Sequence, residues 1–178
     1  KEFVELEKQM WWYHSQLSST HPYASKPWQW ILNLKPVWMF VDWSRGGRVA
    51  HIFNYGNSVL LWTGLGAALY TLMRERASSW AIQFCLLCYF WLWLPWTFSP
   101  RIMLFYHYAP AVPFLALLLS RKLVAFWQSP VRWQRNIAVA VPVLAVLWFL
   151  VFLPINVGIS IPTDVANAFY RNLVPGYP

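Results

Sequence analysis

Charged residues are absent from four long stretches of the chain, and apolar residues dominate those stretches. They are 25, 24, 19 and 28 residues long and cover residues 49–73, 77–100, 102–120 and 136–163. Because a helix needs about 20 apolar residues to cross the hydrocarbon core of a bilayer, each stretch is long enough, or nearly so, to span a membrane. The pattern predicts four membrane-spanning helices at about 57–73, 79–98, 103–120 and 136–156.

The residues before these stretches follow a different pattern. Residues 1–20 carry apolar side chains at helical spacing with charged residues between them, which predicts an amphipathic helix ending near Ser18-Ser19-Thr20. Residues 21–56 have no sustained period and predict an irregular interfacial segment, with one short helix around 28–34. The tryptophans of this segment suit the headgroup belt of a membrane.

Together these patterns predict an all-α fold, a polytopic membrane helical bundle. Residues 1–56 form an outer-face amphipathic helix and interfacial loop, residues 57–156 form the four-helix transmembrane bundle, and residues 157–178 form an outer-face tail.

The composition agrees with a membrane protein. Of the 178 residues, 58% are hydrophobic and only 11% are charged, whereas about 25% are charged in soluble domains. A buried helix of a large soluble protein can be equally apolar, but this chain is too short to wrap four such helices in a polar shell. The net charge of +8 lies in short flanks between apolar stretches, where lipid headgroups attract Lys and Arg. This distribution indicates membrane lipid as a partner, and no nucleic acid.

The positive charges also predict the orientation. The loops 74–78 and 121–135 hold six Lys and Arg residues, whereas the loop between the second and third spans holds only Arg101. Because positively charged loops stay in the cytoplasm, we expect both ends of this chain to be extracytoplasmic. Arg45 and Arg48, which flank the first span on its outer side, weaken this bias.

His, Tyr and Arg residues gather on the predicted outer side. The candidates are His14, His21, Tyr23, Ser25, Trp28, Arg101, Tyr106, His107 and Tyr108. Amphipathic rings also settle at headgroups without further function, so anchoring is the alternative interpretation. His107 is the sharpest candidate, because an ionisable side chain within a span marks a functional-site hypothesis. Arg101 offers donors that suit a lipid phosphate, although a simple headgroup contact would explain it equally.

Other chemistry has few candidates in this sequence. There is no Gly-rich phosphate loop, nucleophile elbow or metal-ligand spacing, so we expect no metal and no cofactor. Cys85 and Cys88 form a C-x-x-C pattern inside an apolar run and are interpreted as small packing residues. A general base from this chain would have to be Asp42, Asp164 or a histidine.

Five motifs resemble those of the protein O-mannosyltransferases. The run MWWYHSQL at 10–17, THPYASKPWQW at 20–30 and KPVW at 35–38 resembles the segment that opens the C-terminal four-helix domain of that family. PRIMLFYHYAPAVPF at 100–114 is similar to the family pattern P-R-x-x-F-x-Y-H-Y-x-P-x-x-P-F. YGNS at 55–58 resembles its G-N-P, with Ser58 in place of Pro. The resemblance covers about residues 5–155.

This resemblance implies the C-terminal membrane portion of a GT-C glycosyltransferase. Such an enzyme transfers mannose from a polyprenyl-phosphate-mannose donor to Ser or Thr hydroxyls of secreted or membrane proteins on the extracytoplasmic face. The acidic catalytic pair of the family would lie in the remainder of the transferase, N-terminal to this chain, so residues 1–178 alone are expected to be inactive. Arg101 and His107 are predicted to bind the carrier phosphate.

Short loops, the absence of a MIR insert and Lys35 in place of the usual Arg favour a bacterial relative, a multi-pass protein of the plasma membrane. Two alternatives stay open. One is a non-catalytic membrane subunit that binds lipid or a partner protein, and the other is a GT-C transferase that uses another sugar.

Overall fold

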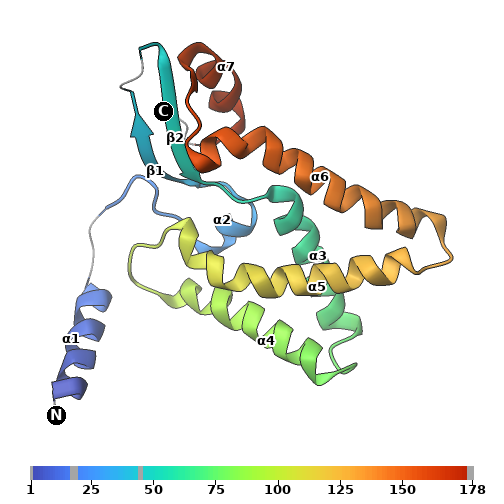
Figure 1. Ribbon diagram of the computed structural model, residues 1–178. Helices are drawn as coiled ribbons and strands as arrows, with labels where there is room; N and C mark the ends of the chain where they lie inside the picture. Colours follow the sequence, from blue (N-terminus) through green and yellow to red (C-terminus); the bar gives the residue numbers. More distant parts are fainter. Residues whose placement is uncertain (1, 17–19, 44–45, 176–178) are drawn as a thin grey trace.

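The chain folds into a helical bundle with a small sheet and a separate N-terminal helix at one end (Figure 1). The computed structural model describes residues 2–16, 20–43 and 46–175. Helix α1 (Glu2–Gln16) lies apart from the bundle, and none of its residues is buried. The predicted end of this helix falls partly on residues 17–19, outside the described residues.

Four helical segments form the bundle. Helix α3 (Ser58–Arg74) is followed by α4 (Trp80–Trp93), which continues into the 3-10 helix η1 (Leu94–Phe98). The 3-10 helix η2 (Phe105–Ala111) leads into α5 (Val112–Trp127), and α6 (Arg132–Val157) follows. Side chains of Asn57 and Ser79 accept hydrogen bonds from backbone N–H groups in the first turns of α3 and α4, which defines where these helices begin.

Among the described residues, three segments are long and apolar enough to cross a membrane. They are Trp80–Phe98, Phe105–Trp127 and Arg132–Val157. Helix α3 has 17 residues, fewer than the about 20 that the hydrocarbon core requires. The structure thus supports membrane-spanning length for three of the four predicted helices. Helix α5 also extends beyond the predicted end at residue 120, because the apolar residues 123–127 continue its helical pattern.

Close packing holds the bundle together where small residues meet large ones. A Cβ atom built at Gly64 of α3 would lie 2.7 Å from Leu115 Cγ of α5, so only glycine permits this approach. Ala68, one turn further along α3, is fully buried in the same core cluster. Small residues allow such van der Waals contact between helices, which is the main source of helix association in lipid.

The expectation of an all-α fold is wrong, because residues 37–54 form a β-hairpin where we predicted an irregular segment. Strands β1 (Val37–Asp42) and β2 (Arg48–Asn54) pair antiparallel, with a register shift between Trp38 and Phe40. Strand β3 (Ile161–Pro162) pairs with the start of β2 and completes a sheet in the order β1-β2-β3. Gly46 and Gly47, with positive φ angles of 39° and 72°, lie in the connection between the first two strands.

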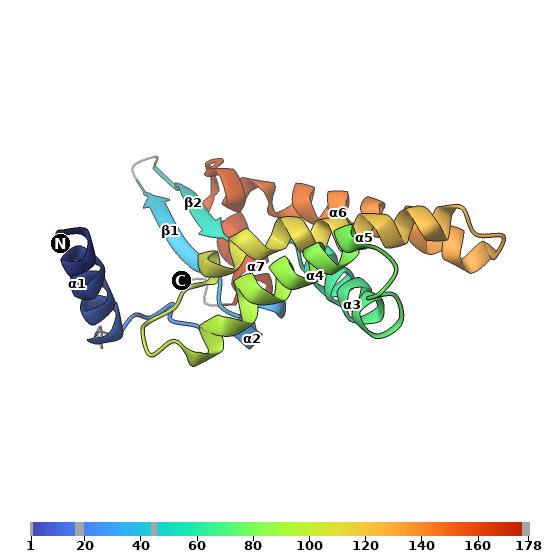
Figure 2. The ribbon, with the colours of Figure 1, turned by 90° about the horizontal axis from the view of Figure 1, so that it is seen from below.

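The hairpin is stabilised by its own aromatic packing and by the C-terminal helix. Trp38 stacks on Phe53 with 6.1 Å between ring centroids, so it belongs to the sheet more than to a headgroup belt. Helix α7 (Thr163–Leu173) buries Ala166 and Tyr170 in a second core with β2 and the end of α6 (Figure 2). The Tyr170 hydroxyl donates a 3.0 Å hydrogen bond to the carbonyl of Val151.

The short helix predicted around 28–34 is present as α2 (Pro27–Ile31).

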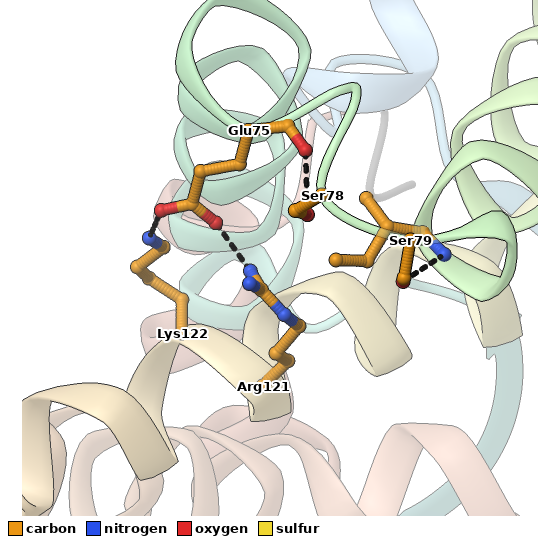
Figure 3. Close-up of polar contacts among 6 residues, drawn as sticks. Glu75, Ser78, Ser79, Arg121 and Lys122 are labelled. Carbon is orange, nitrogen blue, oxygen red and sulfur yellow. Dashed lines mark hydrogen bonds and ion pairs between the residues drawn. The ribbon is translucent and has the colours of Figure 1, made fainter.

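At the opposite end of the bundle, one carboxylate joins two helices. Lys122 and Arg121 of α5 both donate to Glu75, which directly follows α3 (Figure 3). The hydrogen bond from Lys122, reinforced by Arg121, lowers the pKa of Glu75 below its usual value. The carboxylate therefore stays ionised near neutral pH and ties the turn after α3 to α5.

Candidate functional site

A cavity of about 670 Å³ lies between the C-terminal end of α1 and the segment that joins α4 to α5. It contains the two sharpest candidates from the sequence. Its walls are formed by Trp11, His14, Ser15, Trp91, Leu92, Pro95, Trp96, Phe98, Ser99, Pro100, Arg101, His107 and Pro110.

Arg101 is the cationic residue in this wall. Pro95 lies in η1, and the chain leaves that helix at Phe98, so Arg101 lies in the irregular turn before η2. Its Nη1 atom lies 3.0 Å from Nδ1 of His14, which comes from α1, 87 residues earlier in the chain. Its Nε atom is buried and has no hydrogen-bond partner among the described residues. A buried guanidinium N–H without a hydrogen-bond partner is costly, and the guanidinium to which it belongs is a good donor group for an anion.

His107 faces the same cavity from η2. Its Nδ1 atom is 2.9 Å from the carbonyl oxygen and 3.2 Å from the backbone N of Leu104, so the preceding backbone fixes this side of the ring. Trp96 packs edge-on against the ring at 4.8 Å, and Tyr106 stacks on it at 4.6 Å. With Nδ1 held by the backbone, Nε2 is the ring atom available to a ligand, as donor or acceptor according to the tautomer.

Aromatic residues give the cavity an apolar surface. Trp11, Trp91, Trp96 and Phe98 line it, together with Leu92. Trp91 and Phe98 are 72% and 88% exposed, so their rings face outward from the bundle. A wall that combines one guanidinium with large apolar surfaces suits an amphiphile, with its anionic group at Arg101 and its hydrocarbon part on the rings.

The structure brings together only some of the predicted site residues. His14, Arg101 and His107 line the cavity, and Tyr106 stacks beside His107. Two others are core residues: Ser25 accepts a 2.8 Å hydrogen bond from Trp30 Nε1, and the Tyr108 hydroxyl lies 2.9 Å from that of Tyr89. Both side chains are buried, and neither lines the cavity.

The remaining candidates lie on α2 and in the segment that leads into it. His21 accepts a 3.2 Å hydrogen bond from the backbone N–H of Tyr23, whose side chain packs against the main core. Trp28 is 54% exposed on α2. None of these three lines the cavity, and sequence reasoning in turn missed the aromatic wall. A tryptophan in an apolar run has the same pattern whether it faces lipid or a cavity.

Three further polar residues of the segments expected on the outer side, His51, Asp42 and Asp164, do not line the cavity. His51 is buried in the hairpin, where Trp38 Nε1 donates to its Nδ1 at 3.1 Å, and burial lowers its pKa. Asp42 ends β1 and Asp164 begins α7, and neither lines the cavity. Among the described residues the cavity wall thus offers imidazole and guanidinium groups but no carboxylate.

Comparisons with known proteins identify the family. Residues 1–175 match the family described as the C-terminal four TMM region of protein-O-mannosyltransferase. A curated relative, the polyprenol-phosphate-mannose–protein mannosyltransferase of Corynebacterium glutamicum, is 26% identical over 172 residues. That match covers 86% of this chain and 33% of the relative, so the chain spans about a third of the relative's length.

Two yeast proteins also match. The dolichyl-phosphate-mannose–protein mannosyltransferase 4 of Saccharomyces cerevisiae is 34% identical over 62 residues, which are 35% of this chain and 8% of that protein. The structure of the S. cerevisiae protein O-mannosyltransferase Pmt1-Pmt2 complex bound to the sugar donor has a TM-score of 0.68 and 22% identity. The structural alignment covers 88% of this chain and 24% of the matched chain. Together with the TM-score, this coverage shows that the two share the same fold.

The family match confirms the resemblance carried by the MWWYHSQL, THPY and PRIMLFYHY motifs. The family match extends over residues 1–175 of the chain. Three described helices have the length and composition of membrane spans. The chain therefore belongs to the family of C-terminal membrane regions of protein O-mannosyltransferases.

Proposed function

We propose that this chain is the C-terminal membrane portion of an enzyme that transfers mannose from polyprenyl-phosphate-mannose to Ser or Thr hydroxyls of secreted or membrane proteins. The observation that carries the proposal is Arg101, whose guanidinium lies in the wall of an apolar cavity with Nε lacking a partner among the described residues. The C. glutamicum relative, whose name includes the donor polyprenol-phosphate-mannose, supports the choice of ligand.

In this proposal the cavity binds the carrier end of the donor. The phosphate contacts Arg101 and His107, and the first part of the isoprenoid chain lies on the rings of Trp91, Trp96 and Phe98. When the bond from mannose to phosphate breaks, negative charge increases on the departing phosphate. A fixed guanidinium stabilises that charge without having to reorganise, which lowers the barrier to transfer.

The acceptor hydroxyl also needs a base, and we assign that group to another part of the protein. The cavity wall has no carboxylate among the described residues, and neither Asp42 nor Asp164 lines it. The chain spans about a third of the bacterial relative, so the remainder of a complete transferase has ample length to supply an acidic residue. Residues 1–178 alone are thus expected to transfer no mannose.

We further propose a four-span topology in which α3 crosses the membrane with α4, α5 and α6. The loops 74–78 and 121–135 are cytoplasmic in this arrangement, because they contain six positively charged residues and one acid. The cavity, the hairpin and both ends of the chain then face outward, and a bacterial plasma membrane is the location that we expect.

Transfer of radiolabelled mannose tests the function in the complete protein. Wild-type protein should transfer label from polyprenyl-phosphate-mannose to Ser or Thr of an acceptor peptide, and Arg101→Ala should lower transfer sharply. Arg171→Ala is the matched control, since it removes one exposed arginine from α7 away from the cavity. Folded wild-type protein that transfers no mannose with any acceptor peptide would contradict the proposal.

Cysteine labelling tests the topology separately. In a background with Cys85 and Cys88 replaced by Ala, Ser99→Cys should react with an impermeant reagent only from the extracytoplasmic side. Arg132→Cys should react only from the cytoplasmic side. Labelling of both positions from one side would refute four spans in this orientation.

A non-catalytic membrane subunit that binds a lipid phosphate is the second candidate function. The absence of a carboxylate from the described cavity wall favours it, because binding requires only the cation and the apolar wall. Such a subunit would bind polyprenyl phosphate and give no transfer in the same assay. A transferase for another sugar would transfer label only from a different donor.

A further inference from the structure

A second cavity, of about 500 Å³, lies between α3, α5 and α6. Its lining comes from the middle of α3, the second half of α5 and the first half of α6, next to the connection between α5 and α6 (Figure 1). It shares no lining residue with the cavity that contains Arg101. It is therefore a separate site at the other end of the bundle.

The walls of this second cavity are mainly apolar and leave open space beside a glycine. Leu119, Leu123, Phe126 and Ile137 contribute side chains to it. At Gly66 a Cβ atom would meet no atom within 4 Å, in contrast to Gly64 in the same helix. The missing side chain at position 66 thus keeps part of the cavity open without serving the packing of the helices.

One cation lies in this apolar wall. The side chain of Lys122 is 12% exposed, and its Nζ atom lies 4.1 Å from the centre of the Tyr70 ring. It donates to Glu75, but Arg121 donates to the same carboxylate, so two cations share one negative charge. An ammonium group has three N–H donors, so Lys122 retains donors for a second anion.

The surroundings of the cavity carry an excess of positive charge. The loops 74–78 and 121–135 contain six Lys and Arg residues, and Glu75 is the one acid in these segments. A negative headgroup is attracted to such a surface, whereas a zwitterionic headgroup gains little. The apolar walls add a requirement for a hydrocarbon chain, which free phosphate does not meet.

We propose that this cavity binds one anionic phospholipid, with an acyl chain against Gly66, Phe126 and Trp133 and its phosphate at Lys122. The site is independent of mannose transfer and of the donor cavity. It would hold α3 against α5 and α6 by filling the space between them, in the leaflet opposite to the donor.

Native mass spectrometry of the full-length protein tests this site. The purified protein is mixed with equal amounts of phosphatidylglycerol and phosphatidylcholine, and the lipid that it retains is counted. Wild-type protein should retain one phosphatidylglycerol preferentially, by about fivefold over phosphatidylcholine, the factor that corresponds to about 1 kcal/mol for one nearby cation.

Two variants act on different parts of the site. Gly66→Leu fills the open space and should abolish retention of that lipid, while Ala140→Leu adds the same side chain at an exposed position of α6 and should not. Lys122→Gln should weaken retention about fivefold. Arg76→Gln removes a positive charge from an exposed position in the same loops and should have little effect.

The outcomes are decisive in each arm. Equal retention by wild type and Gly66→Leu would overturn the location, and equal retention of the two lipids would overturn the role of charge. Displacement of phosphatidylglycerol by inorganic phosphate would identify a plain anion site and would also overturn the proposal. Because Gly66→Leu leaves every charge in place, a folding defect in Lys122→Gln does not remove the test.

Discussion

The two ends of the helical bundle hold their positive charge in opposite ways. At one end, Arg101 lies beside the imidazole of His14, and its Nε has no partner among the described residues. At the other end, Arg121 and Lys122 share the carboxylate of Glu75. A carboxylate cancels much of the field of a neighbouring cation, whereas an imidazole does not. Charges that look alike in the sequence are thus held differently: a carboxylate compensates the cations at the second end, whereas Arg101 has an imidazole beside it.

Of the variants considered, replacement of Arg101 should have the largest effect on mannose transfer. Loss of a fixed donor to developing negative charge lowers turnover by about 10²–10³-fold, so Arg101→Ala should reduce mannose transfer by about that factor. Arg101→Lys keeps the charge but loses the forked geometry, and it should retain more transfer than Arg101→Ala. Transfer rates of the complete protein, normalised to folded protein by melting curves, provide the measurement. Near-wild-type transfer by folded Arg101→Ala would mean that this arginine only anchors its turn at the membrane surface.

His107→Ala should have a smaller effect at the same end. The ring contributes one hydrogen bond to a charged phosphate in the proposed complex, so its loss should lower transfer by about tenfold or somewhat more. The melting temperature of the variant is the control, because the ring also contacts the backbone of Leu104. A large fall in melting temperature with unchanged transfer per folded molecule would assign His107 to the fold.

Glu75→Gln should produce the reverse result at the other end. It removes the shared carboxylate and leaves Arg121 and Lys122 close together. Because Arg121 is 41% exposed and solvent screens the pair, the expected loss of stability is only about 1 kcal/mol. The melting temperature in detergent should fall by a few degrees while transfer per folded molecule is unchanged. A strong loss of transfer would contradict the assignment of Glu75 to stability alone.

Acid should reproduce part of the Glu75→Gln effect. The pKa of Glu75 is lowered in the folded protein, so its contribution to stability is complete above the unfolded value near 4.5. It is lost as the pH falls through the lower, folded value. As the pH falls below about 4.5, wild-type protein should therefore lose slightly more melting temperature than Glu75→Gln. Parallel pH profiles for the two proteins would show that this ion pair contributes nothing measurable.

The sequence predicted most of the helices, and it singled out residues that line the cavity, because the relevant signals are local. Runs without charge identify α4, α5 and α6, and the motif around Arg101 and His107 leads directly to the cavity wall. Ser25 and Tyr108 occur in the same motifs but belong to the core. Motif membership alone does not separate residues that line the cavity from packing residues, because both occur in the same short segment.

The hairpin and the aromatic wall could not be predicted in the same way. The register shift after Trp38 interrupts the alternation that would identify β1, and β3 has only two residues whose pairing partners are Arg48 and Val49. Trp11 reaches the cavity from α1, and Trp91 from α4. Such contacts depend on how distant segments meet in space, which the hydropathy pattern of any one segment does not contain.

The pairing of β2 with β3 has a consequence for the number of membrane crossings. Val49 and Ile161 are partners in one sheet, so the chain must return to the same side of the membrane between them. A return requires an even number of crossings, and α4, α5 and α6 account for three. Helix α3 is the remaining bundle helix between the two strands, and parity therefore supports the proposed fourth crossing despite its 17 residues. Two backbone pairings in the smallest strand of the protein thus constrain the path of more than 100 residues.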